Sequence, residues 1–196
     1  MKKLLSLLLP LALLLSLTAC GEKSADTDTR QTPPTLAVTS KNACSITLKS
    51  SSYDWRYTQG LQGMTAIACG AHPLDETSRD TTPVLEIPFT VSSAYFSPIT
   101  LDFGDNSPES VTVRCWPSDA WGTTGTPSET VTAQKQDDGT FRADLPQSDG
   151  IFAVDALWDG SNATYSFSTH ADDSATGYVS ETFSVEPAHI REIEVD

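Results

Sequence analysis

Carboxylates crowd one stretch of the chain, and paired carboxylates can hold a cation or act as a general acid and base. Asp102, Asp105, Asn106 and Glu109 fall within eight residues of one another, and oxygen-rich loops of this kind can bind calcium. The stretch lacks the spaced Asp-x-Asp-x-Asp-Gly series and the bidentate Glu of a dedicated calcium loop. We therefore favour a solvated turn whose side chains bond the local backbone, and keep a metal site at Asp102, Asp105 and Glu109 as the alternative.

Nucleophilic catalysis has little support in the sequence. The three histidines are His72, His170 and His189, and no Gly-x-Ser-x-Gly nucleophile elbow accompanies them. His72 precedes Pro73 in an expected loop, where a structural hydrogen bond is the favoured role. No two histidines have the spacing of zinc ligands on one element. The sequence thus indicates a non-enzymatic protein without a cofactor.

Three cysteines follow the N-terminal region, namely Cys44, Cys69 and Cys115. None of them belongs to a Cys-x-x-Cys pair, which argues against a thioredoxin-type redox site and against a zinc knuckle. We expect all three to be buried, reduced thiols that pack as small hydrophobes. One disulfide with one free thiol is the alternative.

Aromatic residues supply the clearest candidates for ligand contact. Tyr53, Trp55 and Tyr57 alternate along a strand and so share one face, where they could form a flat platform for sugar rings. A row of this kind inside a sandwich more often belongs to the core, and we favour the core for these three. Trp121, followed by Gly122 in a loop between strands, is the aromatic residue that we expect to contact a partner.

The N-terminal region has the composition of an export signal. A basic pair at residues 2–3 precedes a leucine-rich run at residues 4–17. As a helix the run would rise only about 21 Å, short of a hydrocarbon core of roughly 30 Å, and Pro10 weakens it further. Small residues ending at Ala19 then lead to Cys20, as in a processed secretory signal.

These residues resemble the signal of bacterial lipoproteins, whose lipobox ends in a cysteine. The resemblance implies diacylglyceryl transfer to the Cys20 sulfur, cleavage after Ala19, and Cys20 as the N-terminus of the mature chain. Two or more acyl chains would hold the protein firmly at the outer side of the cell membrane. An ordinary signal peptide with an incidental cysteine is the alternative.

The charge balance of the chain is strongly acidic. Among 196 residues, 12 are Lys or Arg and 26 are Asp or Glu, which gives a net charge of −14. Loss of Lys2 and Lys3 with the signal would leave 10 of the 12 basic residues against 26 acids, a net charge of −16. No cluster of Lys and Arg offers a surface to nucleic acid, which is excluded as a partner. The remaining length suffices for one sizeable core, and we expect a single domain over residues 36–196.

Between the signal and that domain, residues 21–35 contain no large aliphatic or aromatic residue. Such a segment buries too little surface to offset its ordering entropy. We therefore expect residues 20–35 to be the lipidated cysteine followed by a disordered tether. Its root-mean-square span would be about 20 Å, with an extended limit near 50 Å.

From residue 36 onward the pattern is that of strands. No long 3.6-residue periodicity occurs, and short β-rich runs are separated by Gly, Pro, Asp and Asn, as in an all-β sandwich or barrel. We predict an immunoglobulin-like β-sandwich of antiparallel strands. The strands are expected near residues 43–49, 52–58, 63–70, 84–91, 97–103, 110–116, 128–136, 140–145, 150–158, 162–169 and 178–185.

Turn residues and alternation add detail to this prediction. Glycine-containing turns at residues 60–63, 137–139 and 159–162 predict three hairpins. The strand at residues 150–158 is apolar on both faces, so we expect it to be central. Alternation places Val111, Val113 and Cys115 on one common face of their strand.

Short motifs of aromatic and small residues run along the domain. They are Ser52-Tyr53-x-Trp55-x-Tyr57, His72-Pro73-Leu74, Leu101-x-Phe103, Val111-x-Val113-Arg114-Cys115-Trp116, Trp121-Gly122, Val154-x-Ala156-x-Trp158 and Ala163-x-Tyr165-x-Phe167. In this order they resemble an uncharacterised extracytoplasmic β domain of Firmicutes, found alone in lipoproteins and appended to some membrane metallopeptidases of the β-lactam-sensor type. The resemblance covers roughly residues 45–170. It implies a surface domain of unknown ligand connected with envelope sensing, and supplies no catalytic residues.

Together these features predict a membrane-anchored, extracytoplasmic lipoprotein that acts as a binding or envelope-sensing module, with an envelope protein or glycan as partner. A hydrolase of envelope polymers, using a carboxylate pair such as Asp102 and Glu109, is one alternative. A structural accessory subunit of a membrane protein is another.

Overall fold

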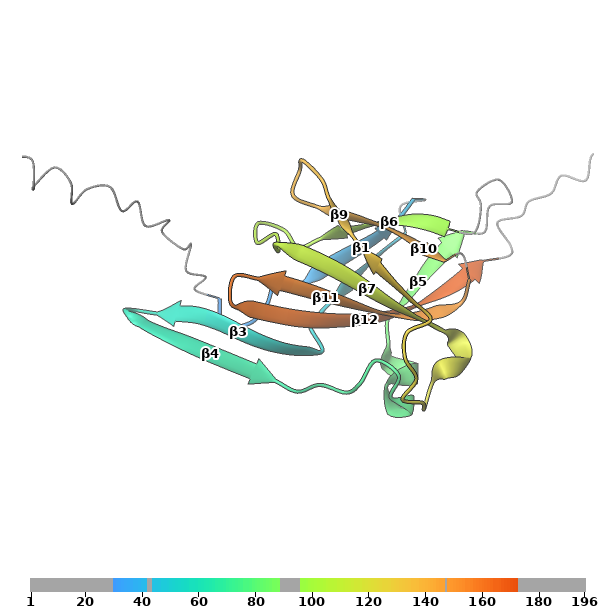
Figure 1. Cartoon of the computed structure of the whole chain (residues 1–196), viewed down its shortest axis with the longest axis horizontal. Helices are drawn as coiled ribbons and strands as arrows, with labels where there is room; N and C mark the ends of the chain where they lie inside the picture. The colour runs from blue at the N-terminus through green and yellow to red at the C-terminus, as the bar shows by residue number, and fades with distance from the viewer. Residues whose placement is uncertain (1–29, 42–43, 89–95, 147, 173–196) are drawn as a thin grey trace, which may run out of the picture.

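Two packed β-sheets form the part of the protein described by the computed structural model, which comprises residues 30–41, 44–88, 96–146 and 148–172 (Figure 1). The predicted all-β sandwich is confirmed, while its assignment to the immunoglobulin-like type stays a prediction. Within these residues, no helix has both the length and the apolar character needed to cross a bilayer.

The first sheet has five strands in the order β2-β1-β6-β10-β9, and each neighbouring pair is antiparallel. The bounds of these strands are β1 (Leu36–Ser40), β2 (Ser45–Leu48), β6 (Phe96–Asp102), β9 (Gln134–Lys135) and β10 (Phe141–Pro146).

The second sheet has seven strands, in the order β4-β3-β12-β11-β7-β8 with β5 paired to β12. The bounds are β3 (Ser52–Gln59), β4 (Gln62–Ala68), β5 (Val84–Pro88), β7 (Ser110–Pro117), β8 (Glu129–Thr132), β11 (Gly150–Trp158) and β12 (Ser161–Asp172). One edge of β12 pairs with β3 near its start and with β5 near its end, the latter in the parallel sense. Two short 3-10 helices, η2 (Glu76–Thr81) and η3 (Ser118–Ala120), lie in the connections.

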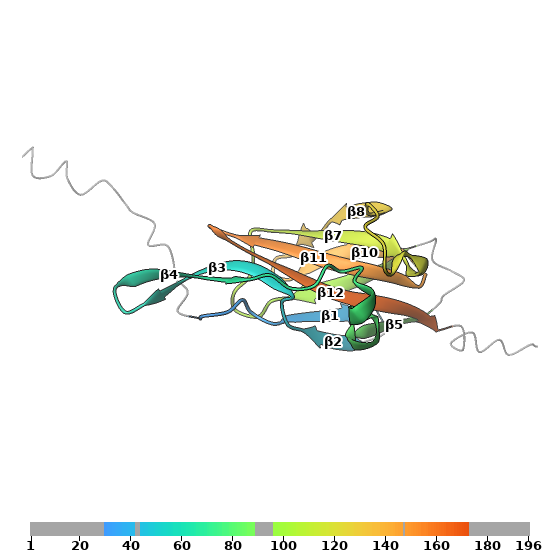
Figure 2. The same cartoon turned by 90° about the horizontal axis from the view of Figure 1, so that it is seen from below.

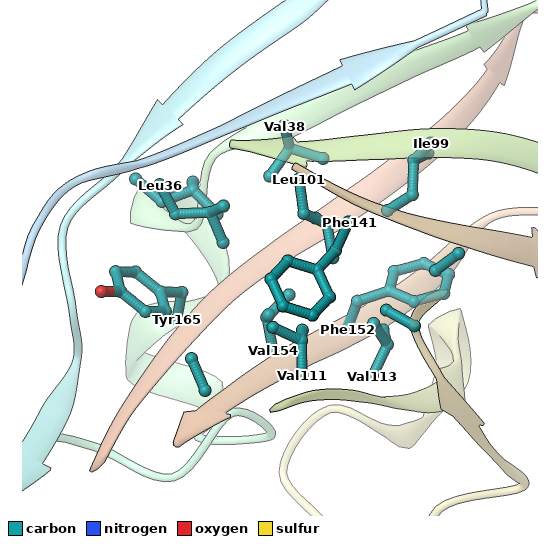
Figure 3. Close-up of a cluster of buried hydrophobic side chains, with 14 of the residues drawn as sticks. Leu36, Val38, Ile99, Leu101, Val111, Val113, Phe141, Phe152, Val154 and Tyr165 are labelled. Carbon is teal, nitrogen blue, oxygen red and sulfur yellow. The ribbon is translucent and has the colours of Figure 1, made fainter. Parts of the chain in front are cut away.

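The core lies between the two sheets, where alternating side chains of both sheets meet. β1 and β6 contribute Leu36, Val38, Ile99 and Leu101, which face Val111, Val113, Phe152, Val154 and Tyr165 of the second sheet (Figure 3). The predicted common face of β7 is buried. β11 is central as predicted, between β12 and β7, and both of its faces are buried over most of its length.

All three predicted hairpins are confirmed. β3–β4 and β11–β12 close with two-residue turns in which Gly60 and Gly160 have φ of 65° and 69°, a backbone conformation that glycine adopts without a Cβ penalty. β9 and β10 pair across the turn at residues 136–140.

Other predicted strands differ from the structure. β1 lies outside the predicted strands, and the predicted strand at residues 128–136 is two strands. Its first part, β8, pairs with β7 in the second sheet, whereas β9 pairs with β10 in the first sheet. The break falls at buried Ala133, whose N–H donates to the Val111 carbonyl at 3.0 Å. The predicted strand at residues 178–185 and the end of the strand at residues 84–91 lie outside the described residues.

The expectation of a disordered tether is wrong for residues 30–35, because these residues are part of the packed domain. The indole N–H of Trp55 donates to the Arg30 carbonyl at 2.9 Å, and the hydroxyl of buried Tyr165 donates to the Pro34 carbonyl at 2.8 Å. Pro33 and Pro34 are themselves buried. Two large side chains of the sandwich thus find their acceptors in a segment whose own composition is polar.

Replacement of Tyr165 by Phe should lower the free energy of unfolding by about 1 kcal/mol, because the Pro34 carbonyl would lose its buried partner. Urea denaturation of the full chain at pH 7 measures this loss. Tyr53→Phe removes the same atom from a half-buried tyrosine of β3 and should have a smaller effect. Equal losses in the two variants would contradict the role given to Tyr165.

The stability difference between the protein and its Tyr165→Phe variant should also depend on pH. Burial raises the pKa of Tyr165 above its ordinary value of 10.0. Above pH 10 the unfolded chain therefore loses this proton while the folded protein keeps it, so the tyrosine's contribution is complete below pH 10 and declines as the pH rises. Urea titrations from pH 7 to 11 should show the advantage of Tyr165 shrinking only at the alkaline end.

Candidate functional site

Two loops partly cover the outer face of the seven-stranded sheet, and we call residues 69–83 and 118–128 the two-loop cap. η2 lies in the first loop and η3 in the second, side by side at the end of the sandwich away from the β3–β4 hairpin (Figures 1 and 2). Beneath the cap, a second apolar cluster joins loop to sheet. Its buried members are Leu74, Trp116, Ile151 and Ala153, with Ala120 and Trp121 packed against them. This cluster gives the cap a hydrophobic base of its own.

Hydrogen bonds hold the two loops to each other and to the sheet. The Gly122 N–H donates to the Leu74 carbonyl at 2.8 Å, and the Trp116 indole donates to the Gly125 carbonyl at 3.0 Å. Gly122 has a φ of 74°, which suits glycine, and a side chain there would also meet Glu76. The loops therefore form one connected unit.

The N-terminus of η2 is capped by Asp75. Its carboxylate accepts from the N–H and the hydroxyl of Thr77 at 2.9 and 2.8 Å, and these hydrogen bonds lower the pKa of Asp75. An Asp at this position satisfies backbone donors that the helix leaves free. The first loop of the cap thus has a defined shape rather than an arbitrary path.

A shallow pocket of about 190 Å³ lies between the first loop and the sheet. Its lining is rich in hydroxyl groups and includes one ammonium group and one imidazole; the residues are Lys49, Ser51, Ala71, His72, Pro73, Ser78, Thr81, Thr82, Pro83 and Ser166. The Ser166 Oγ is buried and has no hydrogen-bond partner within the described residues. Buried polar atoms are normally paired, so this hydroxyl keeps an unused hydrogen-bonding capacity next to the pocket.

The orientation of His72 gives the pocket a further donor. The ring accepts the Leu74 N–H at Nδ1, at 3.2 Å, which confirms the predicted structural hydrogen bond. In the neutral ring the proton then resides on Nε2, which is free to donate. Together with Lys49 and Ser166, this arrangement suits a small ligand that offers several hydrogen-bond acceptors, such as a sugar.

The four tryptophans divide into three buried rings and one partly exposed ring. Trp55, Trp116 and Trp158 are 1%, 3% and 8% exposed, whereas Trp121 is half-buried at the surface of the cap. The platform interpretation is wrong for Trp55, since its ring packs edge-on against Trp158 at a centroid distance of 5.1 Å. Tyr53 and Tyr57 are half-buried and pack against the same core. Trp121 thus remains the aromatic candidate for contact with a partner.

Between the cap and the hairpin, the outer face carries an ionic network. Arg114 forms two hydrogen bonds with Asp155, at 2.6 and 2.9 Å, and Thr164 donates to the same carboxylate at 2.8 Å. The three residues come from β7, β11 and β12. The guanidinium also lies 5.3 Å from the centre of the Trp116 ring, a cation–π contact. This network ties the central strands together beside the cap.

The carboxylate stretch forms the predicted turn. Asp102 accepts the Gly104 N–H at 2.8 Å, the Asn106 carbonyl accepts the Trp158 indole at 3.0 Å, and the Glu109 N–H donates to Leu157 at 2.8 Å. Asp105 is exposed. Across the described ranges, no group of three or more His, Cys, Asp or Glu side chains lies close enough together to hold a metal ion. The carboxylates of Asp102, Asp105 and Glu109, the alternative metal site, are therefore not arranged as metal ligands.

The cysteines only partly follow the prediction. Cys115 is buried in the core, and its burial raises the pKa of the thiol to about 12. The prediction of burial is wrong for Cys44 and Cys69, which are exposed and lie just before β2 and just after β4, where the strands leave the core. All three thiols are free.

Of the remaining histidines and the lipobox residues, only His170 lies within the described residues. The Nδ1 of His170 lies 3.4 Å from a carboxylate oxygen of Asp149. His189 lies outside the described residues, as do Ala19 and Cys20.

The polar residues of the pocket are absent from the sequence-based candidates except for His72. They come from separate segments that only the closed first loop brings together.

Comparisons with protein-family models, with curated proteins and with solved structures found no match to the chain. The likeness to lipoproteins and to the extracytoplasmic β domain therefore stays a prediction from the residues themselves.

Because Trp121 is partly exposed, its fluorescence should be quenched more readily than that of the three buried tryptophans. Acrylamide, a neutral quencher, should readily reach one component of the emission of the four tryptophans, and Trp121→Phe should remove that component. Trp55→Phe should leave it unchanged, provided that circular dichroism confirms folding of both variants. A readily quenched component that survives in Trp121→Phe would contradict the arrangement of the cap.

Proposed function

We propose that this chain is an extracytoplasmic lipoprotein, anchored by acyl chains on Cys20, that acts as a non-enzymatic binding or envelope-sensing module. The leucine-rich signal followed by Cys20 supports the anchor. The surface of the sandwich supports a binding role, because its loops form a defined cap that carries a pocket and a partly exposed tryptophan.

The observation that carries the proposal is the placement of the cap relative to the start of the fold. Arg30 is bonded to Trp55 in β3, at the end of the sandwich from which the β3–β4 hairpin projects. The two-loop cap lies at the opposite end (Figures 1 and 2). A protein anchored ahead of Arg30 would therefore present its cap away from the membrane, towards the envelope.

The chemistry of the cap favours a neutral, polyhydroxylated ligand such as an envelope glycan. Ser166, the Nε2 of His72 and Lys49 supply hydrogen-bonding groups in the pocket, and Trp121 supplies an aromatic surface on the second loop of the same cap. Sugars are commonly bound by such a combination of polar groups and an aromatic face. A net charge of −14 opposes the approach of polyanions.

Cys20→Ser should abolish lipidation and release the protein from the membrane. In Triton X-114 partitioning, the unmodified protein should enter the detergent phase and Cys20→Ser the aqueous phase. Cys44→Ser, which changes an exposed thiol outside the signal, should partition like the unmodified protein. If the Cys20→Ser variant entered the detergent phase, this result would contradict the proposed lipid anchor.

Photocrosslinking on intact cells tests the binding role. A benzoylphenylalanine at position 121 should form a discrete adduct, whereas the same group at Gln136, exposed in the β9–β10 turn, should not. Glycosidase digestion of the adduct separates a glycan from a protein partner, and a single protein adduct would favour the accessory-subunit function. Identical adducts at both positions, or none at position 121, would contradict binding at the cap.

A further inference from the structure

The β3–β4 hairpin projects beyond the sandwich (Figures 1 and 2). β3 pairs with β12 only through residues 52–54, whereas its pairing with β4 continues to Gln59 and Gln62. From Arg56 to the turn at Gly60, a strand advances roughly 13 Å. Tyr57 still packs against the core, so the tip stands clear of the body by somewhat less, about 10 Å.

Exposed apolar side chains gather on this hairpin. Leu61 in the turn is 104% exposed, Ile67 is 70% exposed and Met64 is 38% exposed. No Asp, Glu, Lys or Arg occurs between Arg56 and Asp75, although the whole chain has 12 basic and 26 acidic residues. A projection that is free of charge and bears a fully exposed leucine in its turn is unusual on such an acidic protein and indicates a contact surface.

The hairpin is built to hold its shape. Seven paired positions join β3 to β4, and Gly60 has the positive φ that a tight turn requires. At the base, the Arg56 N–H donates to the Ser161 Oγ at 2.9 Å, and Trp55 is anchored in the core. β4 is the terminal strand of its sheet. Terminal strands are commonly protected by charged residues or proline, and β4 contains neither.

We infer that the tip of the β3–β4 hairpin inserts into the surface of the membrane that carries the anchor, with Leu61 as the inserted side chain. This inference rests on the proposed lipid anchor. Cys20 and Arg30 are ten positions apart, so the lipid lies no farther than about 35 Å from the point where Arg30 meets β3. The hairpin and the anchor therefore belong to the same end of the molecule.

Electrostatics favour the hairpin as the part that meets the bilayer. Anionic headgroups repel an acidic surface, whereas the uncharged tip meets no such barrier. The contact need not be strong, because an anchored protein already experiences a high local concentration of lipid. A second point of attachment would restrict the tilt of the sandwich and hold the two-loop cap outward.

Fluorescence in proteoliposomes tests the insertion. The full-length lipoprotein is prepared with Leu61→Trp or with the control Val84→Trp, which changes an exposed apolar residue where β5 begins, away from the hairpin. Each variant is reconstituted into vesicles of phosphatidylethanolamine and phosphatidylglycerol with brominated acyl chains. For Leu61→Trp we expect an emission shift to shorter wavelength and loss of intensity through bromine quenching, with neither change for Val84→Trp.

The outcomes separate this inference from the proposed function. Vesicle-bound Leu61→Trp protein whose emission shows no shift and no more bromine quenching than that of Val84→Trp protein would overturn insertion and leave the anchor standing. Failure of the unmodified protein to associate with vesicles through Cys20 would overturn both. Protection of the Leu61→Trp ring on intact cells, but not in pure lipid vesicles, would assign the hairpin to a protein partner and also overturn insertion.

Discussion

Two buried hydrogen-bond donors fix the position of the segment that precedes the first strand. The hydroxyl of Tyr165 and the indole N–H of Trp55 lie in the core, and each needs an acceptor that the strands around it do not supply. The carbonyls of Pro34 and Arg30 satisfy them. Residues 30–35 are thereby held against the sandwich, and the path of the chain towards Cys20 starts at the hairpin end of the molecule.

This constraint gives the sandwich two unlike ends. The hairpin end is uncharged at its tip and exposes Leu61 there, which suits contact with lipid, whereas the opposite end carries the polar pocket and Trp121. β11 connects the two ends, since one face lies in the main core and the other forms the base of the two-loop cap through Ile151 and Ala153. Binding chemistry at one end and attachment at the other would follow from the same strand framework.

Local patterns in the sequence account for much of this fold. Glycine turns predict the hairpins, and alternation predicts the buried face of β7 and the central position of β11. What they miss depends on contacts between distant segments: the hydrogen bond from Tyr165 to Pro34 joins residues 131 positions apart. The change of sheet at Ala133 and the pocket beside Ser166 likewise require the packed structure, because neither has a local signal. For the site, Trp121 lies in a loop as expected and is partly exposed, whereas composition alone wrongly assigns residues 30–35 to a tether.

The central claim is that residues 30–35 are docked at the hairpin end, opposite the cap. Electron–electron double resonance on the full chain, with Cys44 and Cys69 changed to Ser, tests it most directly. One variant carries spin labels at Gln31 and Leu61, and a second carries them at Gln31 and Thr123 in the cap. Docking predicts narrow distance distributions in both variants, with the distance to Leu61 the shorter one. Broad distributions in both, or a shorter distance to Thr123, would contradict it.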